Sequence, residues 1–173
     1  TGLTRMAEEA RQRREENELD YYRNPSSGKL GEFGEVRAVM FYGKGEHFCV
    51  GVNPYSFIKN TKRLPVITAA SVTKFIYTAF VRVRQIKAPV VCVAHGKIVG
   101  GGFAAMLNSD YRILVDDDTT VLNYGNMPRG VCPGVMLSTN LPRMVGETNA
   151  FNAYLQDAFF SPQEAVAMGL GNE

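Results

Sequence analysis

The sequence predicts an α/β fold in which helices pack on a mainly parallel sheet. Short apolar, β-branched runs alternate along the chain with longer segments that carry apolar residues at helical spacing, and this alternation is typical of α/β proteins. The 173 residues are enough to bury a sizeable core and correspond to one domain, or most of one. Internal repeats and low-complexity tracts are absent from the sequence.

The stretch from Ala88 to Asp110 is the one around which the others are organised. Pro89 opens an apolar, β-branched run at residues 90–94, which predicts a strand buried on both faces. Three glycines, Gly100–Gly102, then precede a helix-compatible apolar segment at 103–107. Strand, glycine turn and buried helix form an anion site, because bare N–H groups face outward at a helix N-terminus. The same residues also fit a tight turn with close strand–helix packing.

The remaining elements are bounded by glycine, proline or capping residues. Helices are expected at residues 3–18, 71–87 (capped by Ser71), 135–145, 147–155 and 161–167 (opened by the capping signal Ser-Pro-Gln-Glu). Strands are expected at residues 36–42, 111–115 and 119–122, with a short apolar element at 48–52. Loops are expected at residues 17–34 (a surface insertion loop), 54–69 (a mobile flap) and 125–134 (rich in Gly and Pro).

Composition excludes several classes of function. The net charge is only +2 and no basic stripe with interleaved aromatics is present, so we expect no nucleic-acid partner. No apolar run approaches the ~20 residues that span a membrane, so we expect no membrane partner. The three cysteines and two histidines have no metal-binding spacing and predict no metal. An odd number of cysteines indicates a reducing, intracellular compartment. The sequence starts at Thr1 rather than at Met, so the question whether the native N-terminus carries a targeting segment stays open.

Six segments in order resemble the crotonase superfamily, the enoyl-CoA hydratase/isomerase family: residues 36–51, 87–102, 110–113, 129–134, 141–146 and 161–170. The resemblance implies a crotonase-like ββα spiral. The family's first strands and its C-terminal helices have no counterpart here, so residues 1–173 are expected to form a single, partial crotonase-like domain. Because the family's C-terminal helices build trimers, the resemblance also implies a homotrimer for the intact protein.

The resemblance implies that the backbone N–H groups of Val52 and Gly101 hold a thioester carbonyl and stabilise an enolate. In such a site, each preorganised donor is worth about 3–4 kcal/mol. Substrate-binding positions are expected beside these donors, at Gly51, Gly100, Gly102, Lys62, Pro133 and Gly134. No cofactor is implied, and CoA or phosphopantetheine is the carrier of the substrate.

The sequence departs from the family where hydratases carry two glutamates. Ala104 and Asn126 stand at those positions, and neither can exchange a proton near neutral pH. Alkene hydration and ordinary isomerisation are therefore disfavoured, whereas decarboxylation of a 3-carboxylated or glutaconyl-like thioester generates the enolate directly. Asn126 is a candidate hydrogen-bonding residue. Tyr124 is a candidate proton donor, with a core or surface tyrosine as the alternative.

The amino-acid sequence of residues 125–134 resembles that of the crotonase homologues of polyketide β-branching cassettes, which include a dehydratase and a decarboxylase. The first hypothesis is therefore a lyase acting on an acyl-CoA or acyl-carrier-protein thioester in polyketide or fatty-acyl metabolism. The second is a catalytically silent scaffold or subunit, which would be favoured if Val52 or Phe103 filled the pocket. The third is a hydratase or isomerase with replaced acid/base groups. The sequence does not identify the acyl group of the substrate or the cellular compartment of the protein. Three residues are expected to be structural: His95, Asp110 and Arg112. Cys132 has no nearby sequence partner that would lower its pKa, so we do not expect it to be a nucleophile.

Overall fold

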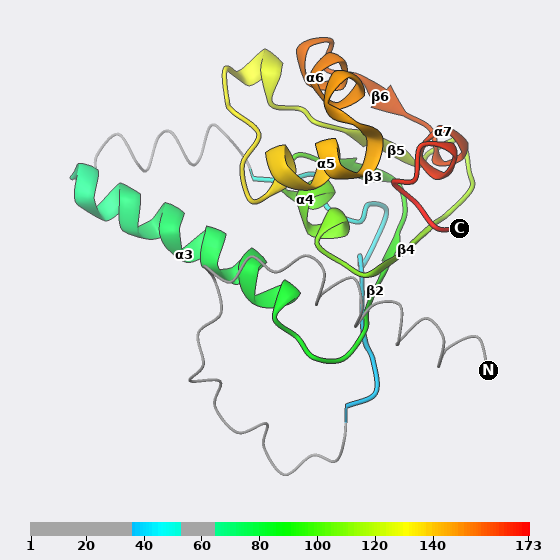
Figure 1. Ribbon diagram of the computed structural model, residues 1–173, viewed down its shortest axis with the longest axis horizontal. Helices are drawn as coiled ribbons and strands as arrows, with labels where there is room; N and C mark the ends of the chain where they lie inside the picture. The colour runs from blue at the N-terminus through cyan, green and yellow to red at the C-terminus, as the bar shows by residue number, and fades with distance from the viewer. Residues whose placement is uncertain (1–35, 53–64) are drawn as a thin grey trace.

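A computed structural model describes residues 36–52 and 65–173 (Figure 1). The expected helix at 3–18, the insertion loop at 17–34 and Lys62 in the expected flap lie outside the described residues. The described part confirms the α/β class, with helices and two small sheets. The strands are β1 (Val39–Tyr42), β2 (Val90–Ala94), β3 (Lys97–Val99), β4 (Tyr111–Leu114), β5 (Val121–Asn123) and β6 (Phe159–Phe160). The helices are α3 (Val66–Arg84), α4 (Gly101–Leu107), the 3-10 helix η2 (Met127–Arg129), α5 (Leu137–Val145), α6 (Glu147–Leu155) and α7 (Pro162–Ala167).

Both sheets have three strands, and their pairing is mainly parallel. In the first, β2 lies between β1 and β4 and pairs parallel with each, with Val39 opposite Val90 and Cys92 opposite Arg112. In the second, β5 lies between β3, to which it is parallel, and β6, to which it is antiparallel. The expected mainly parallel sheet is thus confirmed. β3 and β6 were not predicted, because runs of three and two residues are too short to show alternation.

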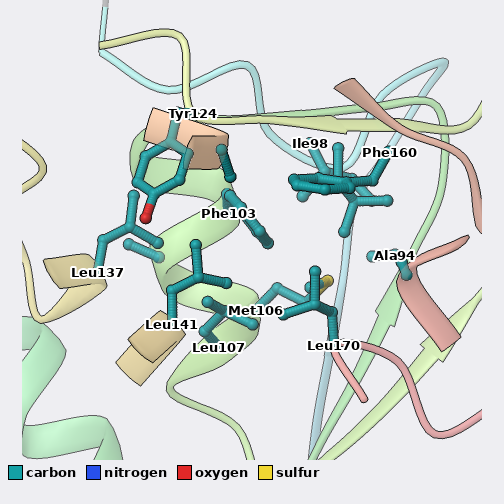
Figure 2. Packing of buried hydrophobic residues seen from close by; sticks show 14 of the residues in the cluster. Ala94, Ile98, Phe103, Met106, Leu107, Tyr124, Leu137, Leu141, Phe160 and Leu170 are labelled. Carbon is teal, nitrogen blue, oxygen red and sulfur yellow. The ribbon is translucent and has the colours of Figure 1, made fainter. Parts of the chain in front are cut away.

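The core is built around α4. Phe103, Met106 and Leu107 of this helix are buried, and Figure 2 shows them beside Leu137 and Leu141 of α5. Each fully buried side chain of this size contributes about 1.5–3 kcal/mol relative to exposure. Ile98 of β3 and Phe160 of β6 close the same cluster from the second sheet. The central apolar segment of the sequence is therefore the central helix of the fold.

Helix α3 differs most from its prediction. It begins at Val66 and ends at Arg84, so the residues from 66 to 69 are helical rather than part of a flap. Pro65 precedes the first turn, where the missing N–H of proline costs nothing. The hydroxyl of Ser71 donates to Ile67 O at 2.9 Å inside the helix, so Ser71 is not its cap. The apolar spacing located the helix, but its start depended on a proline that the sequence analysis assigned to a loop.

By length and composition alone, α3 is also the one helix in the described part of the chain that could cross a membrane. Its mean hydropathy is 1.3 over an 18-residue window, and none of that window is buried. Core helices and signal sequences meet the same criterion, so this is weak evidence. The absence of a membrane partner consequently stays a prediction.

The C-terminal helices agree closely with the sequence. α5 and α6 meet at Gly146, whose φ is +82°. α7 begins with the predicted capping box: Glu164 N donates to Ser161 Oγ at 3.2 Å, and Ser161 N donates to Glu164 Oε2 at 2.8 Å. These boundaries were predictable because a glycine and a capping motif act locally.

Candidate active site

The chain that follows β1 crosses the start of α4. Phe48 N donates to His95 O at 2.8 Å, and Val99 N donates to Cys49 O at 3.0 Å. Cys49 also forms an isolated parallel bridge with Ile98. The apolar element predicted at 48–52 is thus extended chain held against β3, and it brings Gly51 and Val52 to the glycine triplet.

Close main-chain contact at this crossing requires glycine at two positions. A β-carbon on Gly51 would lie 2.8 Å from Val99 O and 3.3 Å from Gly101 N, and the φ of Gly51 is +81°. A β-carbon on Gly102 would lie 2.7 Å from Cys49 Cβ. The distances of 2.8 Å and 2.7 Å are too short for a real side chain. Gly51 therefore lies directly beside the first residue of α4, and Val52 follows it immediately.

The two amides predicted as oxyanion donors belong to these adjacent segments. Gly101 is the first residue of α4, where an N–H has no partner within the helix. Among the described residues, neither Gly101 N nor Val52 N donates a hydrogen bond. The side chain of Val52 is 60% exposed and that of Phe103 is turned into the core. The ring of Phe103 packs against Tyr124 in the core.

Gly100 connects this crossing to the end of β5. Its N–H donates to Asn123 O at 3.1 Å, and a β-carbon on it would lie 3.4 Å from Tyr124 O. The loop that starts at Gly125 consequently begins next to the glycine triplet. The resemblance places substrate-binding residues at Gly51, in the glycine triplet and in the loop 125–134. These three segments are neighbours in the fold.

Neither of the two positions at which the resemblance places the hydratase glutamates holds a titratable group. Ala104 is fully buried in the first turn of α4. Asn126 Nδ2 donates to Cys132 O at 3.4 Å, so the amide nitrogen faces its own loop. Asn126 Oδ1 is buried and has no hydrogen-bond partner within the part of the chain that the structure describes. The carboxamide is thus positioned by the loop 125–134 rather than by the core.

Tyr124 lies in the core, which corresponds to the alternative interpretation of this residue. Its ring packs edge-on against Phe103, with centroids 5.9 Å apart, and against Tyr154, with centroids 5.7 Å apart. The side chain is only 2% exposed, and burial raises its pKa to about 12. The structure therefore gives no support to Tyr124 as a proton donor. Its position directly after the buried strand β5 was the signal for a core residue.

Pro133 and Gly134 line a groove that α3 borders on its other side, and its volume is about 620 Å³. The phenol oxygen of Tyr77 on α3 contacts Gly134 so closely that a β-carbon there would overlap it. Sequence analysis predicted the two loop residues as substrate-binding but missed the α3 side. The signal was present in the spacing of Lys74, Thr78 and Arg82 on one face of a helix.

Three residues predicted to be structural have structural contacts. Arg112 is buried and its Nε donates to Leu170 O at 2.6 Å. Asp110 Oδ2 accepts from Val90 N at 2.8 Å and so fixes the start of β2. His95 Nε2 hydrogen-bonds with Gly45 O at 2.8 Å.

Among the described residues, neither the cysteines nor a cluster of metal-binding side chains forms a further site. Cys132 is exposed and Cys92 is buried, and burial raises the pKa of the Cys92 thiol to about 12. In the described ranges, no group of three or more His, Cys, Asp or Glu side chains could hold a metal ion.

Comparison with known proteins identifies the family. Residues 30–173 match the sequence profile of the enoyl-CoA hydratase/isomerase family, and the chain belongs to that family. The fatty acid oxidation complex subunit alpha of Shewanella putrefaciens is 30% identical over 135 residues, which are 78% of this chain and 19% of that subunit. The corresponding subunit of Shewanella oneidensis is 33% identical over 97 residues, 56% of this chain and 14% of that one.

Solved structures agree with the crotonase-like fold. A Mycobacterium abscessus protein assigned to the enoyl-CoA hydratases/isomerases superposes with a TM-score of 0.73 at 27% identity, covering 80% of this chain and 52% of that one. An enoyl-CoA hydratase from Polaromonas sp. JS666 gives a TM-score of 0.72 at 24% identity, with 79% and 52% covered. The chain thus spans about half the length of these structures, in agreement with a partial domain.

Proposed function

We propose that the protein is a crotonase-fold lyase that acts on an acyl thioester through an enolate. The amides of Val52 and Gly101 hold the thioester oxygen. The observation that carries this proposal is the contact between Gly51 and Gly101, because it brings the residue before Val52 to the start of α4. Among the described residues, the N–H groups of Val52 and Gly101 donate no hydrogen bond. Preorganised donors aimed at a developing oxyanion are the largest single contribution in many acyl-transfer enzymes.

The reaction most consistent with the site is decarboxylation, with dehydration as the alternative. In decarboxylation, the bond to the leaving carboxylate breaks and its electron pair passes into the enolate, so that no carboxylate base is needed. A proton then returns to carbon. Ala104 and Asn126 favour this route over hydration, since hydration needs a titratable group beside water. Dehydration needs a proton for the leaving hydroxyl, and the described residues 104, 124 and 126 do not offer an exposed donor.

The substrate carrier is proposed to be CoA or the phosphopantetheine arm of a carrier protein. The family profile and the similarity to fatty acid oxidation complex subunits support fatty-acyl metabolism. The resemblance to polyketide β-branching proteins is the basis for a carrier-protein substrate. A homotrimer, an intracellular location and the absence of a cofactor are further parts of the proposal.

The variant Gly101→Pro tests the proposal in the full-length protein. Proline is tolerated at the first position of a helix, so the fold should persist while one donor is removed. We expect release of CO2 from a 3-methylglutaconyl thioester to fall by roughly 10²–10³-fold, the usual cost of one oxyanion donor. Arg143→Gln, an exposed change on α5, is the matched control. Unchanged CO2 and water release in Gly101→Pro would overturn the proposal.

A silent scaffold is the second candidate function. The burial of Ala104 and the core position of Tyr124 favour it, because neither position offers the site an exposed proton donor. This candidate predicts that the full-length protein binds no thioester at all. Calorimetric titration with a non-hydrolysable acyl-CoA analogue distinguishes the two, since the lyase must bind the analogue even if the natural acyl group differs.

A further inference from the structure

The groove between α3 and residues 133–139 has the volume of a small-molecule site. Its volume of about 620 Å³ lies within the range of small-molecule pockets. Five residues of α3 and the residue that caps its C-terminal end recur at intervals of three and four and so line it from one helical face: Lys74, Tyr77, Thr78, Val81, Arg82 and the cap Gln85. The opposite wall is the chain that leads into α5.

That opposite wall is a strained turn. Leu137 N donates to Gly134 O at 2.8 Å, and the two residues between them, Val135 and Met136, have φ angles of +47° and +68°. Residues with side chains reach this left-handed region at a cost of about 1–2 kcal/mol each. Asn108 Nδ2 donates to Val135 O at 3.3 Å and holds the turn in place. Strain of this kind persists where a ligand clamp needs it.

The charges of the groove favour a ligand with a negatively charged group. Among the described residues that line it, Lys74 and Arg82 are the only charged ones and none is acidic. Pro133, Val135 and Met136 supply an apolar surface opposite. A ligand that matches both features has an aliphatic body and a negatively charged end. Arginine is well suited to hold a carboxylate through paired hydrogen bonds.

Helix α4 connects the groove to the proposed position of the thioester. The turn is tied to Asn108, which caps the C-terminal end of α4, whereas Gly101 begins that helix. The seven residues of α4 span about 10 Å. A substrate whose carbonyl lies at the Gly101 amide would therefore reach the turn with the far end of an acyl chain.

We propose that the groove binds the terminal carboxylate of an ω-carboxyacyl thioester, with Arg82 and Lys74 as the cationic partners. This inference rests on the proposed function, because it places the thioester at Val52 and Gly101. It assigns the specificity for a dicarboxylic acyl group to α3 and to the turn at residues 134–137.

Binding of two CoA thioesters to the full-length protein tests the assignment. Adipyl-CoA and hexanoyl-CoA share a six-carbon chain and differ in the terminal carboxylate. We expect the wild type to bind adipyl-CoA about tenfold more tightly, as one charge-assisted pair allows. The double variant Arg82→Gln/Lys74→Gln should bind both within about twofold of each other and should keep the wild-type affinity for hexanoyl-CoA.

The remaining outcomes are equally decisive. If the double variant weakens both ligands equally, the two cations bind the phosphates that the ligands share, and the inference is wrong. If the wild type binds both thioesters with the same affinity, the inference also fails, although the proposed function stands. If neither thioester binds, the proposed function itself fails. Arg143→Gln, which removes a charge outside the groove, should preserve the preference for adipyl-CoA.

Discussion

Gly102 and Cys49 are in main-chain contact: a β-carbon on Gly102 would stand 2.7 Å from Cys49 Cβ and would also overlap Cys49 O. This contact holds the 48–52 segment across α4. Gly102→Ala should therefore lower the free energy of unfolding by about 1–3 kcal/mol, as overpacking does. It should also weaken thioester binding, because the segment carrying Val52 must shift. Urea unfolding and titration with an acyl-CoA analogue measure the two effects.

Gly101→Ala is the matched control for this prediction. The nearest atom to a β-carbon at Gly101 is Gly51 Cα at 3.8 Å, an ordinary contact distance. Alanine is also the better helix former, so this variant should be as stable as the wild type. Equal unfolding free energies for the variants at 101 and 102 would contradict the role assigned to the contact with Cys49.

Much of this arrangement was predictable from local sequence. Pro89, the glycine triplet and the box at Ser161–Glu164 act within a few residues, and the elements they bound agree with the structure. The contact of Gly51 with Gly101 joins residues fifty positions apart, and only the family resemblance predicted it. The same holds for the groove, because the spacing on α3 gives a helix face but does not say what that face opposes.

The strained turn before α5 predicts a stabilising substitution. Met136 has a φ of +68° and a ψ of +5° and has no side-chain hydrogen bond to cap α5. Asparagine adopts this conformation more readily than methionine does. Met136→Asn should therefore raise the free energy of unfolding by about 1 kcal/mol. Met127→Asn is the control, because Met127 is not among the residues with positive φ. A gain of the same size in both variants would refute strain at Met136 as the cause.

The buried thiol of Cys92 predicts a loss of stability at alkaline pH. Burial raises its pKa from 9.0 to about 12, so the unfolded chain releases this proton at lower pH than the folded one. The contribution is fully present below pH 9 and is lost between about pH 9 and 12, at about 1.4 kcal/mol per pH unit. Cys92→Ala should make the decline of unfolding free energy with pH shallower. Identical slopes in the variant and the wild type between pH 9 and 11 would rule this out.

Sequence reasoning was least informative at the loop 125–134. The resemblance predicts that Asn126 stands in place of a family glutamate, but the environment of the carboxamide could not be predicted. Its orientation depends on the carbonyl of Cys132, six residues later, which faces Nδ2. A spacing of this kind inside an irregular loop has no period from which it could be predicted.

Asn126 predicts an unusual response to truncation. Its Oδ1 is buried without a hydrogen-bond partner among the described residues, while Nδ2 makes one long bond of 3.4 Å to Cys132 O. A buried, unsatisfied acceptor costs about 1–3 kcal/mol, which exceeds the value of a long neutral hydrogen bond. Asn126→Ala should therefore leave the free energy of unfolding unchanged or raise it. Asn126→Asp should lower it, because a carboxylate would face the Cys132 carbonyl without a donor between them. Urea unfolding at neutral pH gives both values. A marked loss of stability in Asn126→Ala would show that Oδ1 has a partner beyond the described residues, and with it that the loop is held from outside.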